Sequence, residues 1–133
     1  MIVLDASVLI GYLEEGDPHH QEAVELLVEL SDQYLFVPAF TWAEVLVGAV
    51  KLGKVETAVD WINRKLGVAI ANPEGADWPL QLAEMRARTN LKMPDASLLA
   101  TAEVLNAEVA TFDSKLTAIA ASEGLLYQPP ADN

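Results

Sequence analysis

Short apolar runs alternate with longer segments of helical periodicity along this chain, and that alternation restricts the possible fold more than any other feature. Residues 2–4, 35–37, 67–71 and 108–111 predict buried strands, and residues 125–127 predict a weak fifth strand. Strands separated by helices pair in parallel through right-handed crossovers. The pattern therefore predicts an α/β fold, a three-layer α/β/α sandwich around a mainly parallel sheet of about five strands.

Apolar residues at helical spacing fill the segments between the predicted strands. In one segment Val55, Ala58, Val59 and Ile62 recur at i, i+3, i+4 and i+7, the pattern of an amphipathic helix. Helices are expected over residues 23–30, 39–50, 55–66, 78–88, 94–105 and 114–121. No stretch has the composition of a linker, so a single domain is expected over residues 1–133.

The composition excludes several kinds of site. The chain has 52% hydrophobic and 21% charged residues, which is typical of a globular protein. It has no cysteine, which excludes disulfide frameworks, thiolate zinc sites, iron–sulfur clusters and cysteine nucleophiles. The chain has 8 basic and 20 acidic residues, which give a net charge of −12. This charge argues against a general nucleic-acid binder and against attachment to an anionic membrane. A metal-binding cluster of four carboxylates would account for four of those charges.

No segment is predicted to cross a membrane. Asp5, Glu44 and Asp95 interrupt the longest apolar stretches well before the roughly 18 residues that a spanning helix requires. The apolar N-terminus lacks a basic region and contains Asp5, so it is interpreted as part of the fold and not as a signal peptide. The expected location is the cytoplasm.

Acidic residues follow two of the predicted strands. The first strand leads directly into Asp5, and the fourth leads into Asp113. Ligands of open parallel sheets bind beyond the carboxyl ends of the strands, where the strand order reverses, so these two acids share one crevice if their strands are neighbours. Asp95 stands at the opening of a predicted helix. Glu44 lies within an apolar helical segment, on a face that is expected to be otherwise buried.

Each of these acids also has a purely structural interpretation. Aspartate is a favoured N-cap, and Asp5, Asp95 and Asp113 all precede helical segments, whereas Glu44 could lean toward solvent at the rim of its helix. Four carboxylates in one crevice would instead repel one another and require a counter-ion. No lysine or arginine flanks Asp5 or Glu44 closely, and all-oxygen sites suit Mg²⁺ or Mn²⁺. A divalent metal is the simplest answer, and metal pairs about 3.5–4 Å apart can promote phosphodiester cleavage.

Other polar residues near the predicted strand ends are few. Ser7 and Thr111 could hydrogen-bond the acids, although turn and strand-end packing explains them equally well. His19 and His20 adjoin a predicted helix start, where surface placement is expected. The chain has no Gly-rich phosphate loop, and no serine–histidine arrangement competes with the acids.

The segments IVLDASVLIGYL, TWAEVLVGA and MPDASLLATAEVLNAEVATFD, the last followed by Ser-Lys, resemble the PIN-domain family. Within that family they look most like the VapC-type toxins of bacterial toxin–antitoxin pairs. The resemblance covers essentially the whole chain in order, and although each motif is common alone, the ordered set of four acids is specific. It implies a three-layer α/β/α fold and an Mg²⁺- or Mn²⁺-dependent endoribonuclease.

The resemblance also carries the family's site residues onto this chain. It implies that Asp5 and Asp95 are the central metal ligands, that Glu44 and Asp113 complete the cluster directly or through water, and that the product keeps a 5′-phosphate. It implies an RNA substrate, a homodimer, and inhibition by a small antitoxin whose C-terminal segment crosses the active groove.

The alternative function is a catalytically inactive relative that keeps the fold as a partner-binding module. Retention of all four acids argues against it, because a binding module needs no crowded anionic pocket. A haloacid-dehalogenase-like phosphatase would show Asp-x-Asp-x-Thr after the first strand, and a receiver domain would place an acceptor Asp after the third. This chain shows neither pattern.

Two surface hypotheses remain. Arg86, Arg88, Lys92 and Lys115 flank the presumed site and could contact substrate phosphates, with a solvated helix face as the competing interpretation. The helical segments 39–50 and 55–66 carry more apolar surface than one side of a small sheet covers, and part of it is expected to form a dimer interface or an antitoxin groove. Core packing is the ordinary explanation for these residues, which are Trp42, Leu46, Val50, Leu52 and Trp61.

Overall fold

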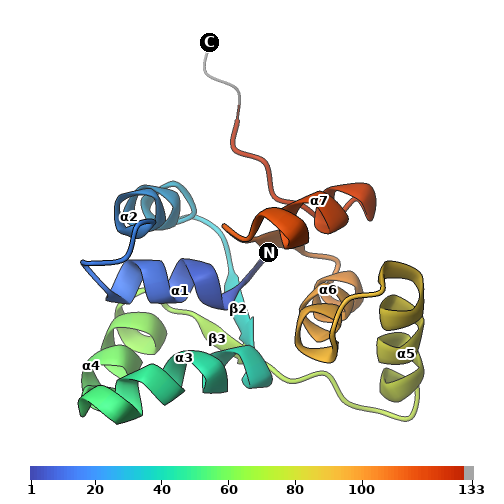
Figure 1. Ribbon diagram of the computed structural model, residues 1–133, viewed down its shortest axis with the longest axis horizontal. Coiled ribbons are helices and arrows are strands. Elements are labelled where there is room, and N and C mark those ends of the chain that lie inside the picture. Colours follow the sequence, from blue (N-terminus) through green and yellow to red (C-terminus); the bar gives the residue numbers. More distant parts are fainter. Residues whose placement is uncertain (131–133) are drawn as a thin grey trace.

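The computed structural model describes residues 1–130 and arranges them as a parallel sheet between two groups of helices (Figure 1). The elements in chain order are β1 (Ile2–Leu4), α1 (Ala6–Leu13), α2 (His20–Glu29), β2 (Leu35–Pro38), α3 (Ala39–Leu52), α4 (Val55–Val59), the π-helix η1 (Asp60–Lys65), β3 (Ala69–Ala71), α5 (Trp78–Thr89), α6 (Met93–Leu105), β4 (Glu108–Ala110) and α7 (Ser114–Ser122). Across residues 1–130 none of these helices has the length and apolar character needed to span a membrane.

The sheet has four parallel strands in the order β3-β2-β1-β4. Ile2 of β1 is in register with Leu35 on one side and with Glu108 on the other. The chain therefore adds β2 and β3 to one edge and then returns to place β4 against the opposite side of β1. The strand order reverses between β1 and β4, and the predicted α/β/α class is confirmed.

The predicted fifth strand is wrong, because residues 125–127 pair with the sheet through a single bridge between Leu126 and Val109. The backbone N–H of Val109 donates to the Leu125 carbonyl at 2.7 Å, and the Tyr127 N–H donates to the Val109 carbonyl at 2.9 Å. Pro129 and Pro130 follow after Gln128, and proline cannot donate to a ladder, so the pairing does not extend.

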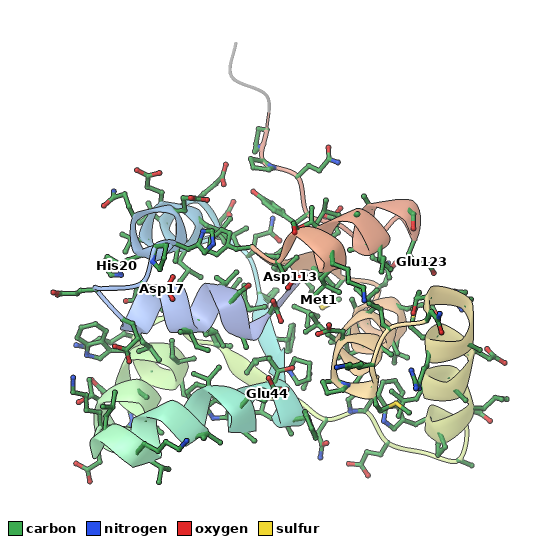
Figure 2. The ribbon with its side chains drawn as sticks, viewed as in Figure 1. Met1, Asp17, His20, Glu44, Asp113 and Glu123 are labelled. Carbon is green, nitrogen blue, oxygen red and sulfur yellow. The ribbon has the colours of Figure 1, made fainter. Side chains whose placement is uncertain are left out.

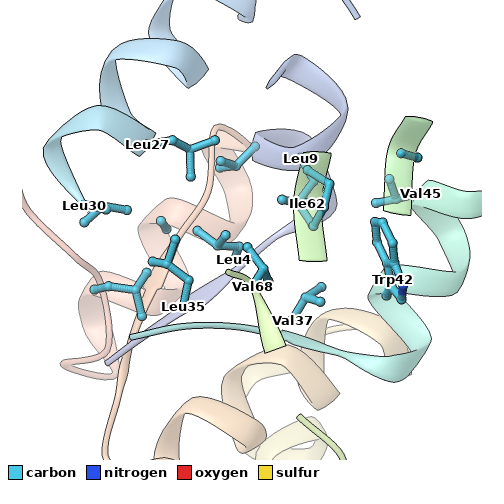
Figure 3. Close-up of a cluster of buried hydrophobic side chains, with 14 residues drawn as sticks. Leu4, Leu9, Leu27, Leu30, Leu35, Val37, Trp42, Val45, Ile62 and Val68 are labelled. Atoms are coloured by element: carbon cyan, nitrogen blue, oxygen red, sulfur yellow. The ribbon is translucent and has the colours of Figure 1, made fainter. Parts of the chain in front are cut away.

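Alternate residues of each strand feed two separate cores. Ile2 and Leu4 pack with α1 to α4, whereas Val3 packs with α5, α6 and α7 on the other face of the sheet. Figure 2 shows side chains filling the space on both sides of the strands, and Figure 3 shows the first core, where Trp42 and Ile62 meet residues of β1 and β2. Burial on both faces explains why the strands read as continuous apolar runs.

The helix predicted over residues 55–66 is present but changes its winding at Asp60. The N–H of Leu66 donates to the Trp61 carbonyl at 3.0 Å, a five-residue step that is typical of a π-helix. Gly67 then adopts a left-handed conformation (φ 68°), which turns the chain toward β3.

Candidate active site

Asp5 lies between β1 and α1, at the point where the strand order reverses. Its backbone N–H donates to the carbonyl of Ala110 at 3.0 Å, which ties the end of β1 to the end of β4. The strands that lead to Asp5 and Asp113 are thus neighbours, as the crevice hypothesis requires. Asp5 occupies the N-cap position of α1, but its side chain makes no capping hydrogen bond.

Two hydroxyl groups hold the Asp5 carboxylate through one of its oxygens. Ser7 Oγ donates to Asp5 Oδ2 at 2.8 Å, and Thr111 Oγ1 donates to the same oxygen at 2.7 Å. The backbone N–H groups of Phe112 and Asp113 in turn donate to these two hydroxyl oxygens, each at 3.0 Å. The expected hydrogen bonds from Ser7 and Thr111 are confirmed. Oδ1 of Asp5 accepts no hydrogen bond from any residue in 1–130, so that oxygen stays available to a ligand.

Asp95 is the third residue of α6, and the capping interpretation is wrong for it because Lys92 holds the N-cap position. A proline in the first turn starts this helix before Asp95 is reached. Burial raises the pKa of the Asp95 carboxyl, and the charges of Asp5 and Asp113 raise it further, while Lys115 and Lys92 oppose the rise. These charge effects place Asp5 and Asp113 within electrostatic reach of Asp95.

Asp113 does cap a helix, as its structural interpretation predicted. Its Oδ1 accepts the N–H of Leu116 at 2.8 Å at the start of α7. The residue is exposed, so capping fixes the orientation of the carboxylate without removing it from solvent.

Glu44 lies on an exposed face of α3, and the expectation that this face is otherwise buried is wrong. Phe40 and Val47, one turn to either side, are 59% and 52% exposed. The residues that α3 buries are instead Thr41, Trp42 and Val45. Partial burial still raises the pKa of Glu44, and the charges of Asp5 and Asp95 raise it further.

The four acids therefore gather around the carboxyl end of β1 from four different parts of the chain. Figure 2 labels two of them, Glu44 on α3 and Asp113 ahead of α7. In the described part of the chain no lysine, arginine or histidine forms an ion pair with any of the four. Within residues 1–130 no three acidic or histidine side chains lie close enough together, as they are placed here, to hold a metal ion. The arrangement is an open anionic site whose repulsion Lys92 and Lys115 offset only in part.

Two of the four basic residues that flank these acids already have partners within the chain. Arg88 donates to Glu123 and to Glu103, both at 2.7 Å, and so ties α5 to the ends of α6 and α7. Arg86 donates to the carbonyl of Leu91 at 2.6 Å. Lys92 and Lys115 are the two whose charges act on the site itself.

An apolar cavity of about 130 Å³ lies beside Glu44, between α1, α3 and α4. Its apolar lining includes Leu13, Ala49 and Leu52. Of the residues expected to supply surplus apolar surface, Trp42 is buried in the core, whereas Val50 and Leu52 are exposed. The outer side of α3 therefore does expose apolar surface, to which Trp42 does not contribute.

The two histidines are partly exposed, with 45% of the His19 side chain open to solvent, so the expected surface placement is confirmed for His19, although both rings also contact other segments of the fold. Nδ1 of His20 makes a 2.8 Å hydrogen bond with the carbonyl of Gly11 at the end of α1. The His19 ring stacks on Phe112, with ring centroids 5.0 Å apart and planes 18° apart. No sequence signal pointed to this pair, because the two rings come from distant segments with no shared periodicity.

The fold is a parallel α/β/α sandwich, and its carboxylates lie where the strand order reverses. These two features define the class of this protein, an α/β domain with an acidic site. A family model described as "PIN domain" matches residues 2–122. The chain belongs to the PIN-domain family, and the resemblance stated from its motifs is confirmed.

Solved structures with the same fold include a chain of a toxin–antitoxin complex and a toxin. A chain in a toxin–antitoxin complex from Klebsiella pneumoniae is 28% identical (TM-score 0.69), over 89% of this chain and 91% of that one. VapC20 of Mycobacterium tuberculosis, described as a toxin that cleaves the sarcin–ricin loop, is 18% identical (TM-score 0.73; 98% and 100% covered). FitAcB of Neisseria gonorrhoeae is 22% identical (TM-score 0.65; 91% and 94% covered). A comparison with curated proteins gives no significant match.

Proposed function

We propose that this protein is the toxin of a toxin–antitoxin pair and acts as a metal-dependent endoribonuclease. The observation that carries the proposal is the gathering of Asp5, Glu44, Asp95 and Asp113 at one end of the sheet with no cation of the described chain paired to them. Its membership of the PIN-domain family and its 28% identity to a chain of a toxin–antitoxin complex support the same function.

The donor set of this site fits Mg²⁺ or Mn²⁺. All four side chains offer carboxylate oxygens, which hard divalent cations prefer, and a cation would relieve the repulsion that raises the pKa of Glu44 and Asp95. We assign Asp5 and Asp95 as the central ligands, with Glu44 and Asp113 completing the set. The bound ion supplies Lewis-acid chemistry, which activates water and neutralises charge on a phosphodiester.

The chain's own residues orient this site and admit the substrate. The hydroxyls of Ser7 and Thr111 fix Asp5 through Oδ2, and Oδ1 accepts no hydrogen bond within residues 1–130. Lys92 and Lys115 provide positive charge beside Asp95, where an RNA backbone would otherwise meet only carboxylates. The helix cap holds Asp113 in one orientation.

Cleavage of a mixed, end-labelled RNA pool tests the enzymatic part of the proposal. The purified chain and an Asp95→Asn variant are compared with chelator, with Mg²⁺ and with Mn²⁺. We expect metal-dependent cutting by the natural chain alone. Cutting that survives in the variant would show that the activity belongs to another site or to a contaminant. If neither chain cuts while metal still raises the melting temperature, two possibilities remain: a very narrow RNA target, or an inactive partner-binding module.

We further propose that an antitoxin segment binds in the apolar cavity beside Glu44. An aliphatic side chain fits its apolar lining, and Glu44 at its edge offers a carboxylate to a cationic neighbour.

In a bacterial host, induced expression of the natural chain should arrest growth, and expression of Asp95→Asn should not. Equal growth of both strains at equal protein levels would contradict the toxin assignment.

The exposed apolar residues of α3 are proposed to pair with a second copy of this chain. Phe40, Val47 and Val50 leave a hydrophobic face that a monomer would expose to water. Sedimentation velocity should show a dimer at micromolar concentration, and Val47→Lys should shift it toward monomer. A monomer in the natural chain would exclude this interface.

A further inference from the structure

A histidine far from the acids in sequence packs against the segment that holds two of the site's groups. His19 precedes α2, and its ring stacks on Phe112 with centroids 5.0 Å and planes 18° apart. Phe112 stands between Thr111, which binds Asp5, and Asp113, which caps α7. The stack therefore covers the middle of a three-residue segment whose ends both belong to the site.

Two hydrogen bonds connect the stacked residue to Asp5. The N–H of Phe112 donates to Ser7 Oγ at 3.0 Å, and that hydroxyl donates to Asp5 Oδ2 at 2.8 Å. A shift of the Phe112 backbone away from Ser7 would lengthen the first bond and remove one of the contacts that fix the Ser7 hydroxyl. The His19 ring is thus coupled to the orientation of the Asp5 carboxylate by three consecutive contacts.

The His19 ring is oriented by this stack and not by a hydrogen bond of its own. Its backbone N–H donates to Asp17 Oδ1 at 2.8 Å, which fixes the turn before α2. Its Nδ1 is buried and has no hydrogen-bond partner within residues 1–130, and the nearest carboxylate oxygen recorded for it, Glu22 Oε1, lies 3.6 Å away. The side chain as a whole is 45% exposed, so the stack covers one part of the ring while the rest meets solvent. The adjacent His20, by contrast, does pair, with the Gly11 carbonyl (Figure 2 labels Asp17 and His20 at this turn).

We propose that His19 is a positioning residue of the active site, which acts through Phe112 to hold the segment 111–113 against Asp5. The inference rests on the proposed function for its catalytic consequence, but its structural part stands without metal or RNA. The turn between α1 and α2 therefore has a role in the site that the positions of the four acids do not indicate.

The test compares His19→Ala and His19→Phe with a matched control, His20→Ala, which removes a neighbouring half-buried imidazole that bonds to α1 instead. The first readout is amide hydrogen exchange of the metal-free chain, followed by NMR. In His19→Ala the Phe112 N–H should exchange about tenfold faster, while the Phe112 N–H in His20→Ala should keep its natural rate. His19→Phe should restore slow exchange, because a phenyl ring can stack on Phe112 without any imidazole nitrogen.

The second readout is Mn²⁺ affinity by calorimetry, together with kcat and KM for RNA cleavage. Groups that orient metal ligands typically change affinity by about 10–100-fold, so His19→Ala should bind Mn²⁺ at least tenfold more weakly and lose kcat more than KM. His19→Phe should recover the natural Mn²⁺ affinity and the natural kcat. Because the two rings act through each other, His19→Ala combined with Phe112→Leu should be no worse than the more affected single variant.

Each outcome decides the inference. Unchanged Phe112 exchange in His19→Ala overturns it, and so does failure of His19→Phe to restore the slow rate. If His19→Ala does not fold, the phenyl variant and the Phe112→Leu single variant carry the same comparison. A natural chain that neither binds Mn²⁺ nor cleaves RNA removes the proposed function and the catalytic role, while faster Phe112 exchange would still establish the structural contact.

Discussion

The Thr111 hydroxyl offers the sharpest test of how this site is oriented. Thr111→Val keeps the shape of the side chain and removes the donor that bonds Asp5 Oδ2 at 2.7 Å and the acceptor that bonds the Asp113 N–H at 3.0 Å. A hydrogen bond to a charged group contributes about 1.5–3 kcal/mol, and the exposed Asp113 amide can rebind water. We expect the free energy of unfolding of the metal-free chain to fall by about 2 kcal/mol.

The effect on metal binding separates orientation from stability. After the substitution Ser7 alone holds Asp5, and the carboxylate can rotate away from the other acids. Loss of one partner that orients a ligand typically lowers metal affinity about 10–100-fold. Calorimetric titration of Mn²⁺ into the folded variant, at a temperature well below its unfolding transition, measures this change.

Thr89→Val is the matched control, because the Thr89 hydroxyl also donates one hydrogen bond and accepts one, and neither partner is one of the four acids. Its Oγ1 donates to the Met85 carbonyl at 2.6 Å and accepts the Leu91 N–H at 3.3 Å, and the residue is also half-buried. It should cost about 1 kcal/mol of unfolding free energy and leave Mn²⁺ affinity unchanged. If Thr111→Val binds Mn²⁺ like the natural chain, the Thr111 hydroxyl does not orient Asp5. Equal weakening in both variants would indicate a global change instead.

Three further predictions follow from the charges of the site. At about 100 times its dissociation constant, Mn²⁺ should add about 2.7 kcal/mol to the unfolding free energy in calorimetric melts, and Asp95→Asn should abolish most of that gain. Folding raises the pKa of Glu44 and Asp95 above 4.5 and 3.8, so the folded chain binds their protons more tightly than the unfolded chain. The metal-free chain should therefore become more stable as the pH falls through the raised pKa values, because protonation relieves the repulsion that is present at neutral pH. Glu44→Gln should flatten this rise in thermal melts across that pH range. Lys92→Gln and Lys115→Gln should each reduce the slope of RNA affinity against salt concentration by about 1, whereas Arg88→Gln should leave that slope unchanged and cost about 0.5–1 kcal/mol of stability.

The fold was predictable because both of its cores depend on short-range patterns. Apolar strand runs and helical periodicity gave the parallel α/β/α order, since a strand that is buried on both faces has no polar alternation. The same rule cannot set strand length at an edge. Residues 125–127 have strand-like composition, but whether they pair depends on Val109 and on the prolines that follow, which periodicity does not weigh.

The site was only partly predictable from the sequence. Asp5 and Asp113 followed from the rule that ligands gather at the carboxyl ends of parallel strands. The face that carries Glu44 did not follow, because α3 has apolar residues on both sides and its buried side is decided by contacts with the rest of the fold. The contact between His19 and Phe112 depends on how α2 lies against the segment after β4, and no local pattern encodes it.

The distribution of these acids explains how so anionic a site coexists with a stable fold. Glu44 and Asp113 are exposed, so water screens much of their repulsion, while Asp5 is stabilised by two hydroxyl donors. The two apolar cores contain none of the four carboxylates. A cation would therefore relieve repulsion within a site that is already folded and would not be needed to build the sheet around it. Stability and metal binding are for that reason separable properties of this chain, which is what allows single substitutions in the site to be interpreted.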